Sequence, residues 1–216
     1  MNRMTQIAAG LALASTAMIA STSASAEVSY NIGYASEYYF RGILQKSSSA
    51  SAGIDFENEG FYVGSWAADV GDGLEVDGYF GYGIETESGI SASIGYTGYF
   101  YTGEFDDTYS EINLGLGYGA FSLGYSFGEW SGFGASEDYD FLELTVTGES
   151  GLYGTFGAFG KDFDGNYLEV GYGMTISDID FGIAAVLSDK DLSDQLNSSG
   201  SPTGSEGIVF SIGKSW

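Results

Sequence analysis

Carboxylates are the main chemistry-bearing groups of this sequence. The 216-residue chain has 30 Asp and Glu residues, 6 Lys and Arg residues, and neither His nor Cys. The usual general bases and thiol nucleophiles are therefore missing. A glycosidase that uses two carboxylates is conceivable, but acids on strand faces are more often part of a polar interior. We expect a protein that is not an enzyme and has no cofactor.

Two acidic segments resemble loops that bind cations. "KDFDGN" (residues 161–166) is similar to a fragment of a calcium loop, and "EFDD" (104–107) is also acidic. Oxygen ligands of this kind suit Ca²⁺. Asp, Gly and Asn also favour ordinary turns, and the full EF-hand spacing is missing. We therefore expect solvated turns and no metal site, with a calcium site as the alternative.

The formal net charge of −24 limits the partners of the protein. Nucleic acid is excluded as a partner because the Lys and Arg residues that would neutralise phosphates are missing.

The first residues have the features of a secretory signal peptide: Arg3, an apolar run over residues 7–20, and Ala24 and Ala26 in an A-x-A pattern. We predict a signal peptide over residues 1–26 and export from the cytosol.

From Glu27 onward, apolar residues recur at every second position. "VSYNIGY" places Val28, Tyr30, Ile32 and Tyr34 on one face, and similar runs follow to the end of the chain. We count twelve such runs; those near residues 61–70 and 152–159 are weak, so ten strands is the alternative. The opposite face consists of Gly, Ser, Thr and carboxylates, whereas the outer face of a soluble sandwich is normally rich in Lys and Glu.

This inverted pattern is typical of a transmembrane β-barrel. We predict an all-β fold: an antiparallel up-and-down barrel of about twelve strands over residues 27–216, with both termini periplasmic. Short connections alternate with longer ones around residues 41–48, 101–108, 128–137, 160–166 and 188–207, and a short one lies near 71–73. The expected location is the outer membrane of a Gram-negative cell, in contact with lipid and lipopolysaccharide. Leu114, Leu144 and Val170 should face the lipid.

The last strand, "GIVFSIGKSW", carries Phe210, Ile212 and Trp216 on the expected lipid face. A closed barrel requires this strand to pair with the first, because lipid cannot satisfy a free sheet edge. Trp216 is then expected in an interfacial aromatic girdle. The segment is similar to the C-terminal signal by which the barrel-assembly machinery recognises outer-membrane proteins.

The inward phase of the strands carries six acids and one base. Arg41 has two readings: it lines a constriction and positions an anion, or it simply pairs with nearby acids of the lumen. The acids outnumber it, so we expect a hydrated lumen that prefers cations. Inward Gly and Ser residues favour an open lumen. The predicted pore-lining residues are Arg41, Asp55, Glu75, Asp77, Glu111, Glu143 and Glu169.

Two functions fit this barrel. The first is a porin-like channel for passive diffusion of small solutes or cations. The second is a structural or surface-recognition barrel with a blocked lumen. Strand number does not decide between them, because about eight strands are filled by side chains and sixteen or more leave a channel.

The chain also resembles the TorF family of proteobacterial outer-membrane porin-like proteins. The resemblance rests on "SEYYFRG" with Tyr38, Phe40, Arg41 and Gly42, on "YVGSWAADV" and "EVDGYFGY", and on "YLEVGYG" and the "GKSW" end. It covers the chain after the signal peptide; Trp216 departs from the Phe that usually ends the family. The resemblance implies an outer-membrane barrel and, less directly, transport.

Overall fold

The computed structural model describes residues 26–216, so the predicted signal peptide lies outside the described residues except for Ala26. The described chain is almost entirely β-strand, with one short 3₁₀ helix, η1 (Lys190–Leu192). Among residues 26–216, no helix is long and apolar enough to cross a membrane. The strands are β1 (Glu27–Phe40), β2 (Ile43–Asn58), β3 (Phe61–Gly71), β4 (Gly73–Glu85), β5 (Ile90–Tyr101), β6 (Tyr109–Tyr118), β7 (Phe121–Trp130), β8 (Glu137–Thr147), β9 (Leu152–Lys161), β10 (Asn166–Ile176), β11 (Ile179–Ser188) and β12 (Ser205–Ser215).

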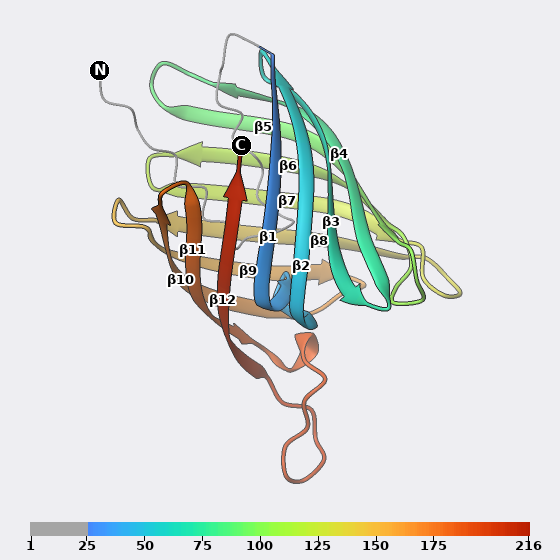
Figure 1. Cartoon of the computed structure of the whole chain (residues 1–216). Helices are drawn as coiled ribbons and strands as arrows, with labels where there is room; N and C mark the ends of the chain where they lie inside the picture. Colours follow the sequence, from blue (N-terminus) through green and yellow to red (C-terminus); the bar gives the residue numbers. More distant parts are fainter. Residues whose placement is uncertain (1–25) are drawn as a thin grey trace.

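These strands form one closed barrel in which each strand pairs with its neighbours in the sequence and β12 pairs with β1 (Figure 1). Every pairing is antiparallel. The prediction of a twelve-stranded up-and-down barrel is confirmed, including the two weak runs, which form β3 and β9. Closure leaves no full-length sheet edge to be satisfied by solvent or lipid.

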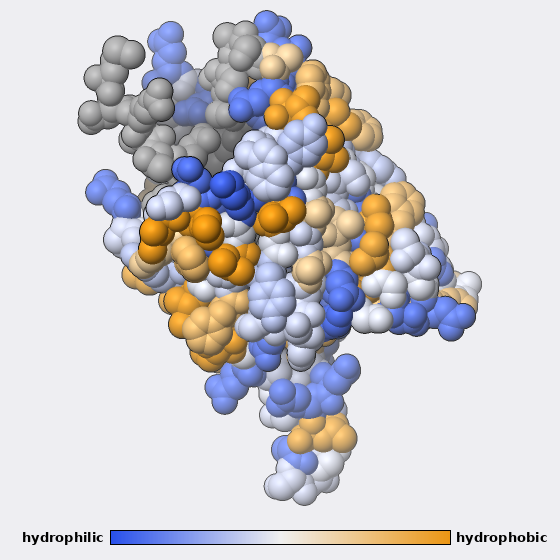
Figure 2. Space-filling model, in the orientation of Figure 1, coloured by the Kyte–Doolittle hydropathy of each residue, from blue (hydrophilic) through white to orange (hydrophobic). Residues whose placement is uncertain are grey.

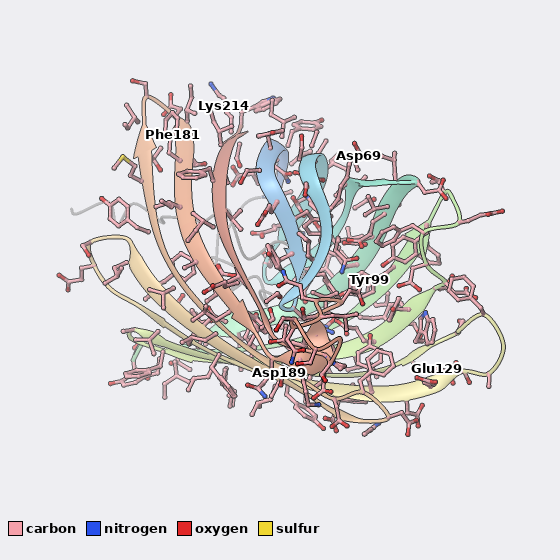
Figure 3. All side chains as sticks on the ribbon, turned by 90° about the horizontal axis from the view of Figure 1, so that it is seen from below. Asp69, Tyr99, Glu129, Phe181, Asp189 and Lys214 are labelled. Carbon is pink, nitrogen blue, oxygen red and sulfur yellow. The ribbon has the colours of Figure 1, made fainter. Side chains whose placement is uncertain are left out.

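The exterior of the barrel is apolar. Leu114, Leu144 and Val170 are 39%, 43% and 47% exposed, so the lipid-facing phase predicted from the sequence is confirmed. Figure 2 shows apolar residues spread over the visible wall, and Figure 3 shows Phe181 pointing away from the interior, in which Tyr99 lies. An apolar outer face on a closed barrel is the arrangement that a bilayer requires. The protein is therefore an outer-membrane barrel.

The two ends of the barrel differ in their connections. At the end that holds Glu27 and Trp216, the five turns after β2, β4, β6, β8 and β10 are short. At the opposite end lie the longer loops 102–108, 131–136 and 189–204, together with the single residue Asp72 between β3 and β4. The expected long loop over residues 41–48 was wrong. Strand β2 runs through residues 43–48, and β1 and β2 meet in a two-residue turn at Arg41 and Gly42.

The far part of the β1–β2 hairpin leaves the barrel wall. The ladder between β1 and β12 stops at the pair Ala35–Ser211, and the ladder between β2 and β3 stops at Ser51–Ala68. Beyond these pairs, β1 and β2 pair with each other as far as the turn. We call residues 36–50 the inner hairpin, because Tyr38, Arg41 and Ser49 are buried inside the barrel, although Leu44 is 45% exposed. In Figure 1 its turn lies well short of the long loop between β11 and β12.

Side chains replace the ladder where the inner hairpin departs. The Phe210 amide on β12 donates to Ser36 Oγ at 2.9 Å. On the other side, Ser49 Oγ donates to the Asp69 carbonyl of β3 at 2.7 Å. The Lys46 ammonium also pairs with the Asp69 carboxylate. These contacts satisfy part of the strand edges that the hairpin leaves behind.

Substituting Arg for Leu144 should destabilise the barrel in the membrane by about 2–4 kcal/mol, because a charge near the bilayer midplane is costly. The measurement is the heat-modifiable, folded fraction in outer-membrane preparations, with Leu144→Ile as the matched control. Equal folded fractions for the two variants would show that this face does not contact lipid.

Substituting Asp for Trp216, or deleting it, should impair insertion into the outer membrane. The Trp216 backbone exchanges two hydrogen bonds with Tyr30, at 2.9 and 3.0 Å, and its ring stacks on the Tyr30 ring at a centroid distance of 6.4 Å. Deletion removes both the last bonds of the closing pair and an exposed aromatic ring. Trp216→Phe keeps the ring and should insert normally; a normal level of the Asp variant would contradict this role.

Candidate functional site

Residues of the inner hairpin contact two clusters of buried side chains, one on each face of the hairpin. On one face, Tyr38 packs with Trp66, Ala68 and Val70 of β3. On the other, Ala35 at the base of the hairpin packs in a cluster with residues of β8, β10, β11 and β12, including Phe141, Tyr167, Val186 and Val209. Tyr38 lies on the phase that faces lipid lower in β1, yet it is only 2% exposed. The hairpin therefore divides the interior instead of forming wall.

Arg41, at the turn of this hairpin, makes the central contact. Its backbone is in the left-handed region with φ 48°, followed by Gly42 at φ 82°. Its guanidinium forms a bidentate pair with Glu111 of β6: Nη1 donates to Oε2 at 2.9 Å and Nη2 donates to Oε1 at 2.8 Å. Both side chains are 0% exposed. The guanidinium also lies 4.4 Å from the centre of the Phe141 ring, a cation–π contact.

Both carboxylate oxygens of Glu111 accept hydrogen bonds. Besides Arg41, it accepts from the hydroxyls of Tyr99 and Tyr139 at 2.8 and 2.9 Å and from Asn113 Nδ2 at 2.6 Å. Arg41 Nη2 also donates to Ser126 Oγ at 3.2 Å. Partners from β5, β6, β7 and β8 thus converge on one ion pair. Such hydrogen bonds offset part of the cost of burying the ion pair, although Arg41 Nε has no hydrogen-bond partner among the described residues.

Tyrosine hydroxyls also satisfy the other acids of the interior. Glu75 accepts from Tyr38 at 2.5 Å and from Tyr101 at 3.0 Å. The pattern repeats around the barrel from strand to strand. Tyr79 donates to Asp55, Tyr153 to Glu169 and Tyr167 to Glu143.

Asp77 differs from these acids. It is 2% exposed, and its Oδ1 has no hydrogen-bond partner among the described residues. Trp66, its cross-strand partner on β3, has an unpartnered Nε1. A donor and an acceptor that are both unsatisfied therefore occupy neighbouring inward positions. Buried polar groups of this kind normally hold a water molecule or mark a functional position.

The expectation that inward glycines leave an open lumen was wrong. A Cβ added at Gly81 or Gly95 would meet the hydroxyl of Tyr62, and one at Gly171 would meet the Tyr153 ring. The glycines therefore make room for tyrosines of neighbouring strands, and these rings occupy the space. The pattern was visible in the sequence, because Tyr99, Tyr139, Tyr153 and Tyr167 all fall on the inward phase.

The interior is closed at the level of the Arg41–Glu111 pair. Glu75, Glu111, Tyr99, Tyr139 and Phe141 are each 1% exposed. A cavity of about 10 Å³ remains between the inner hairpin and β10–β12, lined by Glu37, Tyr39, Val186 and Val209 among others. Such a volume holds one water molecule at most.

All seven residues predicted to line a pore do point inward, and six are buried: Arg41, Asp55, Glu75, Asp77, Glu111 and Glu143. Glu169 is partly exposed and contacts the small cavity. Their role in permeation stays a prediction. In residues 26–216, no group of three or more Asp and Glu residues is arranged to hold a metal ion. Phe210, Ile212 and Trp216 are exposed on β12, as expected for an assembly signal, whose recognition also stays a prediction.

A family model described as "Bacterial protein of unknown function (Gcw_chp)" matches residues 19–204, and the chain belongs to this family. The match does not bear out the more specific TorF resemblance. No curated protein matches the chain.

Solved structures with similar folds include outer-membrane proteins of Pseudomonas aeruginosa. OpdK with vanillate is 14% identical with a TM-score of 0.41, over 80% of this chain and 58% of that one. OccK2 (OpdF) in complex with glucuronate is 12% identical with a TM-score of 0.40, over 79% and 57%. OprD is 11% identical with a TM-score of 0.39, over 88% and 66%. The chain thus spans less than two thirds of these proteins, and likeness at this level carries no functional inference.

Replacing Arg41 with Ala should lower the free energy of unfolding by about 3–5 kcal/mol, because Glu111 is left as a buried, unpaired charge. The double variant Arg41→Ala/Glu111→Ala should lose less than the sum of the two single variants. Urea unfolding in detergent micelles measures both. Lys46→Ala is the matched control: its pair with Asp69 is partly exposed, with side chains 25% and 41% accessible, and its loss should cost at most about 1 kcal/mol. Additive losses at Arg41 and Glu111 would contradict the coupling.

Proposed function

We propose that this protein is a porin-like outer-membrane channel for small solutes, in which the inner hairpin forms the constriction. The observation that carries the proposal is which part of the chain blocks the lumen. The lumen is closed by a hairpin that has left the wall, and not by the wall strands alone. A barrel of twelve strands is wider than the eight-stranded barrels that their own side chains fill. The sequence resemblance to the TorF family is consistent with this function.

The channel should prefer cations. Asp55, Glu75, Asp77, Glu143 and Glu169 lie inside the barrel, and Arg41, the one buried base among residues 26–216, is already neutralised by Glu111. Carboxylates in the lumen favour cation passage, and the acidic residues of the loops 102–108 and 189–204 add to the negative field at the mouth. The solutes would be small cations or neutral molecules.

A structural or surface-recognition barrel is the second candidate, and the filled lumen is the observation that favours it. In that case the ring of tyrosines and acids serves only to stabilise the interior, and the loops 102–108, 131–136 and 189–204 carry the function. The two candidates differ in a single measurable property, the conductance of the folded protein.

In planar bilayers, the refolded protein should conduct, and under a KCl gradient its reversal potential should show cation selectivity. Asp77 is an inward acid whose Oδ1 has no hydrogen-bond partner among the described residues. Asp77→Asn removes its charge and should reduce the selectivity, whereas Leu144→Ile on the lipid face should not. Selectivity should also weaken as salt approaches 1 M, where the screening length is about 3 Å. Clear anion selectivity would remove the cation preference, and silent, fully folded protein would favour the structural barrel.

A further inference from the structure

The ladders that flank the inner hairpin in the barrel wall are incomplete. Strand β1 continues to Phe40 and β12 begins at Ser205, yet their ladder stops at Ala35–Ser211. Continuing the same register would place Glu37 opposite Val209 and Tyr39 opposite Gly207. On the other side, β3 runs on to Gly71 beyond its last pair with β2. Both neighbours of the hairpin therefore present strand edges in a register that the hairpin could complete.

The sequence of the hairpin suits a position in the wall between β12 and β3. Placed in the wall, Tyr38 and Phe40 would continue the outward phase of Tyr34 and would lie at the rim of the barrel, with Ile43 opposite Phe40. Aromatic residues at the rim of a transmembrane barrel form the interfacial girdle. On the same strand, Glu37, Tyr39 and Arg41 would face the lumen. The alternation of β1 is thus correct for the wall, although Tyr38 of the outward phase and Arg41 of the inward phase are both buried in the structure.

The hairpin also has points at which it can bend. Ser48 adopts φ 69°, in the left-handed region that non-glycine residues seldom occupy. The β1–β2 register shifts at Tyr38 and Tyr39, where β2 has one extra residue, Gln45. Such bulges bend a strand and increase its twist. The links to the wall at this level are the Ser36, Ser49 and Lys46 side-chain contacts, which can be exchanged for backbone pairs without breaking any existing ladder.

We propose that the inner hairpin, residues 36–50, has two positions. In the first, seen here, it lies in the lumen and is latched by the Arg41–Glu111 pair. In the second, it completes the wall between β12 and β3, Arg41 remains on the inner face, and the centre of the barrel is vacated. Water then reaches Glu111 and replaces its lost partners. The role of this movement as a gate rests on the proposed channel function.

A disulfide distinguishes the two positions. A Cβ placed on Gly207 would meet the Tyr39 hydroxyl first and the Cζ of its ring next, so the Tyr39 side chain now points at Gly207 with its ring between the two backbones. A disulfide needs Cα atoms about 4.4–6.8 Å apart, and directly paired residues of an antiparallel ladder lie about 4.5–5.5 Å apart. The chain has no Cys of its own. The variant Tyr39→Cys/Gly207→Cys should therefore form a disulfide only when the hairpin enters the wall.

The test uses the full-length protein, refolded and oxidised in bilayers. We expect the disulfide to form and to hold the channel in a high-conductance state, and reduction with dithiothreitol to restore the lower conductance of the reduced double variant. Absence of the disulfide in folded, oxidised protein would overturn the proposal. A disulfide without conductance in either redox state would support the movement and refute the channel function, so the two failures are distinguishable.

A second measurement needs no cysteine. Arg41→Ala and Glu111→Gln both break the latch and should raise the ratio of open to closed time about tenfold or more. Glu143→Gln makes the same change of charge at another buried acid of the interior, which accepts from Tyr167. It should leave that ratio within about twofold of the parent. Equal effects of Glu111→Gln and Glu143→Gln would overturn the latch.

Discussion

The buried pair of Arg41 and Glu111 determines how the interior of this barrel is arranged. A guanidinium and a carboxylate that are both shielded from solvent carry a large desolvation penalty, which only excellent geometry and further hydrogen bonds can offset. The structure supplies both, through two short bonds within the pair and donors from Tyr99, Tyr139 and Asn113. Because Arg41 lies at the turn of β1 and β2, meeting Glu111 requires the hairpin to leave the wall. The departure of the hairpin and the closure of the lumen thus follow from one interaction.

The exterior could be read from the sequence because lipid imposes a simple rule. Every outward position must be apolar and every backbone group must be paired, so strands of period two and a closed ladder are strongly specified. Leu114, Leu144 and Val170 therefore lie where the alternation predicts, and even the weak runs of β3 and β9 are strands. Cooperation between neighbours supports these two strands, since each is held by a ladder on both sides.

The interior could not be read in the same way, because contacts there join residues that are far apart in the sequence. The alternation places Arg41 and Glu111 inside the barrel but does not say that they meet, since 70 positions separate them. It also cannot show that β1 changes its role after Ala35. Tyr38 has the correct phase for lipid and packs instead on Trp66, because the hairpin has moved away from the wall. Local periodicity predicts which side chains of a strand share a face of the sheet. It does not predict where a strand leaves the sheet.

Tyrosine explains how so acidic an interior can be closed. An isolated buried carboxylate would be very costly or would take up a proton, and among residues 26–216 Arg41 is the one buried base. A phenol hydroxyl donates a hydrogen bond without adding charge, and its ring fills the volume that a neighbouring glycine leaves free. Glu75 and Glu169 are held in this way with no cation at all. The same groups can accept water in place of tyrosine when the centre is vacated, so an interior built from tyrosine–carboxylate pairs suits both a closed and a hydrated barrel.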